Sequence, residues 1–304
     1  MTRTRFFLPP VLLVAALLTG CSLQRMALDQ TAGILKETMP AFERDWDFDL
    51  VADALPANIK MLEGFLRAGP DNTTLVLLTA QAYTSYALVV LEDRMERAED
   101  MSPAQARLAL RARTMYMRGH RHGLRLLDLR HPGMAEAAKK SVKALEPYLK
   151  ECDAEDVPGL FWAGMPLAGA INVSRDDVTM IARMPVAKAL IARQLELDDT
   201  YYHAGGHMIF GALYGSVGKM LGGDPKKAQQ HFDKALKMTK RRFLLVQAMY
   251  AKTLAVQLQD EGLFKKLCNE VLKADLSIYP EQKLANVAAK RRARRLMARM
   301  DELF

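Results

Sequence analysis

The chain has 304 residues, of which half are hydrophobic and 26% are charged, and its formal net charge is +8. It contains no low-complexity tract and no linker-like stretch, so the composition excludes a chain divided into separately tethered domains. About 280 residues beyond the N-terminal segment are enough to bury a large core in one elongated domain.

The N-terminal segment up to Cys21 has the features of an export signal. Arg3 and Arg5 precede an apolar run over residues 6–18, and two small residues separate this run from Cys21. Because a helix needs about 20 apolar residues to cross a bilayer, the run is too short to span and predicts a cleaved signal over residues 1–20. The segment LTGC resembles the lipobox of bacterial lipoproteins, in which the cysteine is acylated. Cys21 is therefore the predicted lipidation site, and a plain cleaved signal is the alternative.

The predicted compartment limits the partners of the protein. By the same resemblance, Ser22 stands where an inner-membrane retention signal would carry aspartate, which favours an outer-membrane anchor with the protein facing the periplasm. Removal of Arg3 and Arg5 lowers the net charge from +8 to +6. No nucleic-acid partner is predicted in the periplasm, and the remaining positive charge favours anionic headgroups or an acidic protein surface.

Two cysteines remain after the predicted lipidation site. Cys152 and Cys268 are far apart in the sequence, in a compartment that permits disulfides. Spacing alone does not decide between a disulfide and two separate buried thiols, and both interpretations stay open.

Helix signals dominate the sequence from residue 24 onward. Segments with 3.6-residue periodicity are separated by turn-forming clusters such as RAGPDN, LRHPG and GGDP, and no convincing strand pattern is present. This pattern predicts an all-α fold. The predicted helices cover residues 24–38, 48–67, 72–97, 103–129, 134–150, 159–172, 176–197, 201–221, 225–239, 241–260, 262–275 and 281–302.

Short turns between these helices predict stacked helical hairpins. The segment AQQHFDKAL matches the second helix of a tetratricopeptide repeat, with Ala228 and Ala235 as the small contact residues and Phe232 as the aromatic one. A weaker copy begins at Ala187, and its distance from Ala228 exceeds the regular repeat length, so the repeat is degenerate. The sequence therefore predicts a degenerate tetratricopeptide-like array, an α-solenoid, as a single domain over residues 21–304.

Three predicted helices carry no formal charge, and they cover residues 73–91, 157–174 and 200–218. A helix with one solvent-facing side needs recurring charges, and the glycines and prolines of the second and third segments argue against membrane spans. We expect these helices to converge on an internal pocket or channel, or on a subunit interface. The alternative is that each is a central helix covered by its neighbours.

Aromatic side chains in the three uncharged segments are suited to a nonpolar ligand. Flat apolar faces with a few hydroxyl groups are typical of small-molecule sites, although an aromatic stripe is more often part of a core. The residues predicted to line a hydrophobic ligand passage are Tyr83, Tyr86, Phe161, Trp162, Tyr201, Tyr202, Phe210 and Tyr214.

No enzymatic or metal site is predicted. Gly218 and Lys219 lack the first glycine and the hydroxyl residue of a phosphate-binding loop. His203 and His207 have the spacing of a zinc pair on a helix, but Gly206 stands where a zinc protease carries glutamate and no third ligand is evident. We expect hydrogen-bonded core histidines, no catalytic residues, no metal and no cofactor.

The C-terminal segment KRRARRLMARM predicts a basic helix with an apolar side. Such a helix can contact lipid headgroups or an acidic partner, but it also fits the solvated last helix of a repeat array. We favour the solvated capping helix.

Several segments together resemble one known family. The stretches ALPANIKMLEGFLRAGPDNTTLVLLTAQAYTSYA, LFWAG and GGDPKKAQQHFDKAL, within residues 49–280, resemble the TatT family. Its members are tetratricopeptide-like lipoproteins associated with tripartite ATP-independent periplasmic (TRAP) transporters. The resemblance implies a homo-oligomer, expected to be a trimer, with a hydrophobic passage through each subunit. It also implies a periplasmic solute-binding protein as partner.

These features predict a non-enzymatic, lipid-anchored protein facing the periplasm. We expect it to bind or relay a small hydrophobic molecule or lipid with a solute-binding protein, in the service of a TRAP transporter. The alternative is an envelope scaffold whose grooves hold segments of proteins that assemble the outer membrane or the cell wall.

Overall fold

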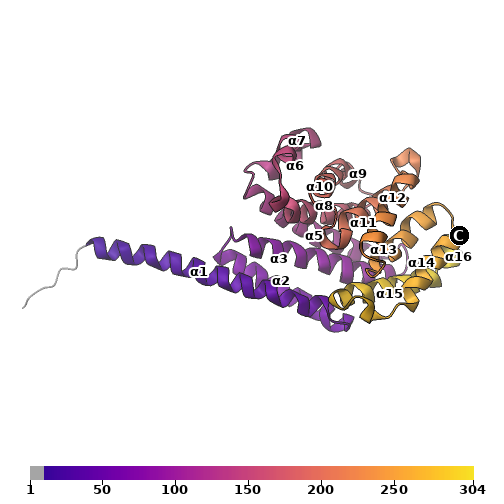
Figure 1. The fold of residues 1–304 in the computed structure, drawn as a ribbon, viewed down its shortest axis with the longest axis horizontal. Helices are drawn as coiled ribbons and strands as arrows, with labels where there is room; N and C mark the ends of the chain where they lie inside the picture. The colour runs from indigo at the N-terminus through magenta and orange to yellow at the C-terminus, as the bar shows by residue number, and fades with distance from the viewer. Residues whose placement is uncertain (1–9) are drawn as a thin grey trace, which may run out of the picture.

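The computed structural model describes the backbone of residues 10–304 and the side chains of residues 24–304 apart from Leu221. This part of the chain is all-α, with no strand, as predicted (Figure 1). Two of the short elements, η1 and η4, are π-helical, and the other η elements are 3₁₀ turns. The elements are α1 (Pro10–Glu43), α2 (Phe48–Ala68), α3 (Thr73–Ser85), η1 (Tyr86–Leu91), α4 (Glu92–Arg97), α5 (Pro103–Asp128), α6 (Met134–Lys140), α7 (Val142–Glu151), η2 (Ala154–Asp156), α8 (Val157–Asn172), α9 (Val178–Ile181), α10 (Met184–Leu197), α11 (Tyr201–Gly215), η3 (Lys219–Leu221), α12 (Pro225–Met238), α13 (Leu245–Tyr250), η4 (Ala251–Ala255), α14 (Glu261–Lys273), η5 (Leu276–Ile278), η6 (Pro280–Gln282), α15 (Lys283–Ala298) and α16 (Met300–Leu303).

Local capping explains why many helices begin where the sequence predicts. The side chains of Asn72 and Asp260 accept hydrogen bonds from the backbone N–H three residues later, each at 2.8 Å. Asp47, Ser102 and Asp224 cap α2, α5 and α12 in the same way. A cap satisfies backbone donors that the first helical turn leaves unpaired, so the turn-forming residues fix the helix starts.

Several predicted boundaries are wrong. The helix predicted over residues 134–150 is divided at Ser141, whose extended backbone and side-chain cap on Ala144 begin a new helix, α7. The segment predicted over residues 176–197 is likewise two helices, α9 and α10. The first helix is longer than the predicted segment 24–38. Its backbone is helical without a break from Pro10 to Glu43.

The described helices pack into three hydrophobic clusters. The first surrounds Trp162 between α5, α8 and α10, and the second surrounds Phe232 among α11 to α15. The third surrounds Tyr83 and joins α2 to α3 and η1. Helix α5 packs against both α3 and α8 and so connects the first cluster to the third.

One helix passes a length and composition test for a membrane span. Within the described residues, the continuous helix Thr73–Arg97 is long and apolar enough, but 72% of its most apolar window is buried inside the protein. A buried core helix meets the same criterion, and α3 has α2, α5 and α8 packed against it.

The N-terminal part of helix α1 projects away from the rest of the molecule (Figure 1). Its C-terminal part contacts α2, α3 and α15, and Ala32 is buried there. The side chain of Cys21, the predicted lipidation site, lies outside the described residues.

The prediction of a solvated basic helix at the C-terminus is wrong. In α15, Arg292 is buried and its guanidinium lies 2.9 Å from a carboxylate oxygen of Glu92 and 3.0 Å from one of Glu96. Arg295 pairs with Asp93 and with Glu96, each at 2.6 Å. The basic face of α15 therefore packs against the acidic face of α4, which is far away in sequence.

The two cysteines of the globular part do not form a disulfide. Cys152 and Cys268 are both free and buried. They belong to different hydrophobic clusters, which fits the interpretation of two separate thiols.

Candidate functional site

The three uncharged segments meet at one pocket, which has a volume of about 350 Å³. The segment 73–91 contributes Leu88, the segment 157–174 contributes residues from α8, and the segment 200–218 contributes residues from α11. Helices α13 and η4 form much of the remaining wall. The lining residues are Leu88, Glu92, Met95, Tyr116, Met165, Ala168, Gly169, Asn172, Arg175, Met208, Ile209, Ala212, Leu213, Ser216, Leu245, Met249, Lys252, Thr253, Val256, Gln257 and Arg292.

Most of the pocket wall is apolar and adaptable in shape. Four methionines contribute to it: Met95, Met165, Met208 and Met249. Methionine is unbranched and polarizable, so it adjusts to ligands of different outline. Ala212 is a small residue of the wall, and Gly169 allows the Tyr116 ring to pack directly on α8. A volume of this size is at the lower end of those that hold small organic molecules.

One part of the pocket wall is charged and internally paired. Glu92 accepts a hydrogen bond from the Tyr116 hydroxyl at 2.5 Å and pairs with Arg292. Lys252 pairs with Glu96 at 2.7 Å. Burial favours the neutral form of Glu96, but the charges of Arg292 and Lys252 prevail and hold the pKa of this carboxyl well below its usual value. Glu96 is therefore charged at neutral pH, and each charged group of this network has a partner of opposite charge.

Arg175 is the cation of the pocket wall without a carboxylate partner among the described residues. It is exposed, and its guanidinium donates a hydrogen bond to the Asn172 side-chain oxygen at 2.5 Å. The pocket therefore combines an apolar wall with one cation that forms no ion pair among the described residues, although the Glu92 carboxylate lies near enough to act on its charge. This arrangement suits a molecule with an apolar body and a polar or anionic end.

The structure brings four of the eight predicted passage residues together, but in the core. Phe161, Trp162, Tyr201 and Tyr202 form one aromatic cluster, in which the ring centroids of Trp162 and Tyr202 are 4.8 Å apart. The Trp162 indole N–H donates a hydrogen bond to the Tyr201 hydroxyl at 3.2 Å. Phe161 and Trp162 are almost completely buried.

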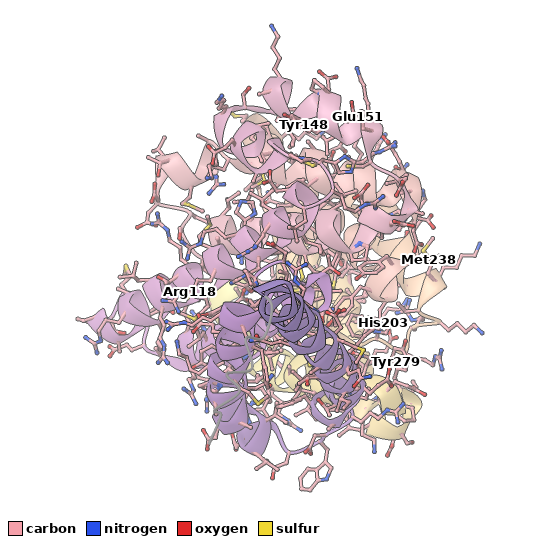
Figure 2. All side chains as sticks on the ribbon, turned by 90° about the vertical axis from the view of Figure 1, so that its left-hand side faces the viewer. Arg118, Tyr148, Glu151, His203, Met238 and Tyr279 are labelled. Atoms are coloured by element: carbon pink, nitrogen blue, oxygen red, sulfur yellow. The ribbon has the colours of Figure 1, made fainter. Side chains whose placement is uncertain are left out.

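The other four predicted residues lie in two further places. Phe210 and Tyr214 stack on each other, with ring centroids 5.5 Å apart, and both stack on His231. Tyr83 and Tyr86 belong to the third hydrophobic cluster. Arg118, which donates to the Tyr83 hydroxyl at 3.1 Å, lies on the opposite side of the molecule from His203 in Figure 2.

None of the eight aromatic residues lines the pocket. The three uncharged segments do converge on a pocket, as the sequence predicts. The apolar side chains that line it are mainly Met, Leu, Ile and Ala. The aromatic rings fill the spaces between the helices instead. The four methionines of the lining come from four different helices and have no regular spacing, so no sequence signal identifies them as a group.

Helix α11 begins with an unusual turn beside the aromatic cluster. Tyr202, His203 and Ala204 have φ of 45°, 59° and 56°, in the left-handed region that non-glycine residues rarely adopt. The His203 ring nitrogen and the Tyr279 hydroxyl are hydrogen-bonded at 2.7 Å, and the two residues lie together in Figure 2. This bond and the packing of Tyr202 hold the turn in place.

The histidines considered for zinc bind other partners. His203 is bonded to Tyr279, and His207 Nδ1 lies 2.8 Å from Nδ1 of His231 on α12. Burial, together with the charges of His207 and Lys234, lowers the pKa of His231 to about 4. The interpretation of His203 and His207 as hydrogen-bonded histidines agrees with these contacts.

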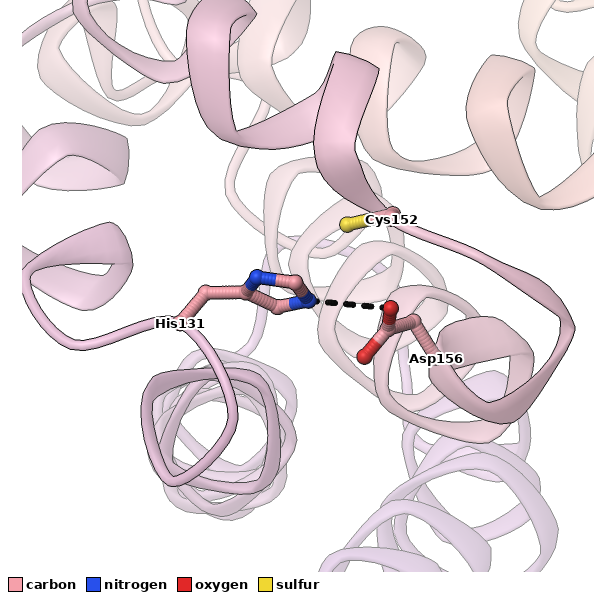
Figure 3. Close-up of side chains that lie close together, drawn as sticks. All are labelled: His131, Cys152 and Asp156. Atoms are coloured by element: carbon pink, nitrogen blue, oxygen red, sulfur yellow. Dashed lines mark hydrogen bonds and ion pairs between the residues drawn. The ribbon is translucent and has the colours of Figure 1, made fainter.

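A different group of possible metal ligands forms where α5, α7 and α8 meet (Figure 3). A ring nitrogen of His131, Sγ of Cys152 and a carboxylate oxygen of Asp156 all lie within 4.8 Å of one another. His131 Nε2 is 2.9 Å from Asp156 Oδ2. Burial raises the pKa of the Cys152 thiol to about 12, with the Asp156 charge as a further cause. Sequence inspection missed this group because its members come from three different elements.

Over the described residues, the fold and the pocket define an all-helical protein with a half-open, largely apolar pocket. The family model described as TRAP transporter T-component matches residues 44–304. The chain therefore belongs to the family of TRAP transporter T-components, as its resemblance to the TatT family predicts. A protein of Treponema pallidum (strain Nichols), described as uncharacterized, is 25% identical over 304 residues, which cover 95% of this chain and 94% of the other.

Proposed function

We propose that this chain binds a small hydrophobic ligand in the pocket between α8, α11 and η4 and relays it with a periplasmic solute-binding protein, as an accessory component of a TRAP system. Membership of the T-component family supports the association with TRAP transport. The observation that carries the ligand proposal is the convergence of three uncharged segments on one largely apolar pocket. No chemical step is required, and the proposed role is binding without catalysis.

The energetics of such a pocket support useful affinity. Removing roughly 300 Å² of apolar ligand surface from water contributes about 7 kcal/mol at ~25 cal/mol/Å². Association and ordering costs take part of this gain, so micromolar binding is the expected range. The four methionines suit a family of related ligands better than one rigid shape.

The wider assembly forms part of the same proposal. We infer a lipid anchor at Cys21 in the outer membrane, a tetratricopeptide-like arrangement of the helical hairpins, and a homotrimer. These inferences rest on the lipobox-like segment and on the resemblance to the TatT family. In this arrangement, docking of the solute-binding protein would open or align the route into the pocket.

A pocket-filling variant tests the ligand proposal. Ala212 lines the pocket from α11, and Ala212→Trp would occupy much of its volume. Ala104 is exposed near the start of α5, so Ala104→Trp is the matched control. The full chain is purified in detergent, and binding of the apolar fluorophore N-phenyl-1-naphthylamine is titrated, with native mass spectrometry for co-purified adducts. We expect Ala212→Trp to weaken fluorophore binding at least tenfold and Ala104→Trp to leave it unchanged.

Equal binding by both variants would contradict a ligand role for this pocket. The relay is tested separately, by mixing fluorophore-loaded protein with the solute-binding protein of the same TRAP system. Transfer of the fluorophore at a rate that depends on the concentration of the solute-binding protein is expected. A rate independent of that concentration would indicate simple dissociation and would count against the relay.

A further inference from the structure

A small polar site lies outside the apolar pocket, where three elements end close together (Figure 3). His131 lies in the turn after α5, Cys152 ends α7, and Asp156 lies in η2 immediately before α8. Cys152 is 3% exposed and Asp156 is 1% exposed, while the His131 side chain is 13% exposed. Two donors are thus fully buried, and the third reaches toward the surface.

The donor set is that of a borderline-soft metal ion. Imidazole nitrogen, thiolate sulfur and carboxylate oxygen are the ligands that Zn²⁺ takes in proteins, whereas Mg²⁺ and Ca²⁺ prefer oxygen alone. Around a tetrahedral zinc ion the donor atoms are roughly 3.4 Å apart, given bond lengths of about 2.0–2.3 Å. The three donors lie within 4.8 Å of one another, so binding requires the longer separations to shorten by roughly 1 Å and the 2.9 Å separation of His131 and Asp156 to lengthen.

Asp156 provides a second observation that points to a ligand. Its Oδ1 atom is buried and forms an ion pair with Arg130 Nη1 at 3.0 Å, but it accepts no aligned hydrogen bond. Its Oδ2 atom accepts from the backbone N–H of Asp153 at 2.9 Å, which fixes the orientation of the carboxylate. Metal-binding carboxylates are commonly held by such outer hydrogen bonds, and an oxygen with an ion pair but no aligned hydrogen bond has a lone pair left for a further ligand.

The charges around the site favour a dication. Arg130 is shared among three carboxylates, at 3.2 Å from Asp153, 3.2 Å from Glu155 and 3.0 Å from Asp156. These three carboxylates and Arg130 carry a net charge of −2. Arg193, which is paired with Glu196, donates to the Cys152 carbonyl oxygen at 2.7 Å and is a further cation beside the site. Glu155 and Asp156 also line a second cavity of about 310 Å³, whose wall is largely apolar apart from these carboxylates, Arg130 and two threonines.

We propose that His131, Cys152 and Asp156 bind one Zn²⁺ ion, with a water molecule as the fourth ligand. The Cys152 thiol releases its proton to solvent when its sulfur bonds to the ion. The proton that His131 Nε2 shares with Asp156 moves through solvent to Nδ1, so that the neutral imidazole and the carboxylate each bond to the ion. The ion links the ends of α5 and α7 to the start of α8. The site is independent of the apolar pocket and of the proposed ligand role.

Zinc stoichiometry and cobalt spectroscopy test this site. The full chain, purified in detergent and stripped with a chelator, is equilibrated with zinc chloride and measured by inductively coupled plasma mass spectrometry. We expect about one tightly bound zinc ion per chain and at least a tenfold loss of zinc affinity in Cys152→Ser, Asp156→Asn and His131→Gln. Cobalt substitution should give a thiolate-to-metal charge-transfer band in the wild-type protein and no such band in Cys152→Ser.

Cys268→Ser is the matched control, because Cys268 is the other free buried thiol and belongs to a different hydrophobic cluster. It should retain both the zinc ion and the cobalt band. Circular dichroism of every variant confirms that the helices are intact before binding is compared. A wild-type protein that retains no zinc would overturn the proposal, and so would a folded Cys152→Ser variant that binds zinc as tightly as the wild type.

Discussion

At the scale of single residues, two glycines of α5 allow the helix to lie close to its neighbours. A Cβ atom at Gly123 would come within 2.3 Å of the Trp162 carbonyl oxygen and 2.4 Å of the Ala163 nitrogen. A Cβ atom at Gly119 would lie 2.4 Å from the Thr84 hydroxyl oxygen. Gly123 therefore sets the distance between α5 and α8, and α8 forms one wall of the pocket.

We predict that Gly123→Ala lowers the free energy of unfolding by about 3 kcal/mol, because both contacted groups are backbone atoms that cannot move without separating two core helices. Thermal unfolding followed by circular dichroism measures the change. Gly64→Ala is the control: Gly64 is exposed in the middle of α2 and a Cβ there meets nothing within 4 Å. It should stabilise the protein by about 0.5–1 kcal/mol through helix propensity. Equal effects of the two substitutions would contradict the close helix contact.

His120 gives the fold a defined pH dependence. Its Nδ1 atom bonds to the Ala163 carbonyl oxygen at 2.8 Å, and Arg183 lies 2.9 Å from its Nε2 atom. Burial lowers the pKa of His120 to about 4 from an ordinary value of 6.5, although the carbonyl bond opposes this shift. The imidazole is therefore neutral in the folded protein over the pH range in which the unfolded chain becomes protonated.

Because the unfolded state takes up the proton first, the contribution of His120 to stability is complete above pH 6.5 and decreases as the pH falls toward 4. We predict that this residue accounts for about 2 kcal/mol of stability lost between pH 7 and pH 5. Urea unfolding at both pH values, in the wild type and in His120→Gln, measures the difference. The variant should be less stable at pH 7 but should lose less stability on acidification, by the amount that His120 contributes. The same pH dependence in both proteins would contradict the prediction.

At the scale of elements, the contact between α4 and α15 depends on buried charge. The Arg292 side chain is 5% exposed and lies between the Glu92 and Glu96 carboxylates. A buried ion pair adds little over an apolar pair, but removing one partner leaves an uncompensated charge in the interior. Lys252 and Arg295 still neutralise Glu96 if Arg292 is lost, so Glu92 is the group most affected.

We predict that Arg292→Met destabilises the protein by about 3 kcal/mol, measured by urea unfolding at pH 7. Arg294→Met is the matched control, since Arg294 is exposed on the same helix and forms no ion pair within the described residues. Its effect should stay within about 0.5 kcal/mol. Destabilisation of similar size in both variants would indicate that loss of a basic residue, and not of the buried network, is responsible.

The helices could largely be predicted from the sequence because their signals are local. Asn72 and Asp260 cap helices through bonds to residues three positions later, so the start of each helix is encoded within one turn. The pairing of Arg292 with Glu92 joins residues 200 positions apart, and no local pattern distinguishes a buried basic face from a solvated one. For this reason the sequence predicts that the basic face of α15 is solvated, whereas the structure buries it.

The candidate site could be predicted only at the scale of segments. The absence of charge over residues 73–91, 157–174 and 200–218 indicates which helices lie in the interior, but it does not say which of their faces borders a cavity. That choice depends on neighbouring helices: Trp162 packs on Tyr202, while Met165, one turn later, faces the pocket. The left-handed turn at Tyr202 also rotates the start of α11, which no helical periodicity anticipates.

At the scale of the whole molecule, the proposed anchor and the pocket lie in different parts of the protein. Helix α1 projects from one end of the molecule, while α11 and α13, which line the pocket, lie toward the other (Figure 1). A protein tethered through the N-terminal side of α1 could therefore keep the pocket accessible to a partner in the periplasm. With this arrangement, loss of the proposed attachment at Cys21 should leave ligand binding in the pocket unchanged.

We predict that Cys21→Ser moves the protein from the membrane fraction to the soluble periplasmic or medium fraction, while fluorophore binding in the pocket is unchanged. Each buried methylene of an acyl chain contributes about 0.8 kcal/mol, and two or more chains are needed for stable anchoring, so loss of the acylated cysteine should abolish attachment. Fractionation with radiolabelled palmitate incorporation measures location and acylation, and the fluorophore titration measures the pocket. Cys268→Ser should retain label, location and fluorophore binding. Cys21→Ser protein that stays with the membranes through a carbonate wash would mean that an uncleaved apolar N-terminal segment, and not acylation, provides the anchor.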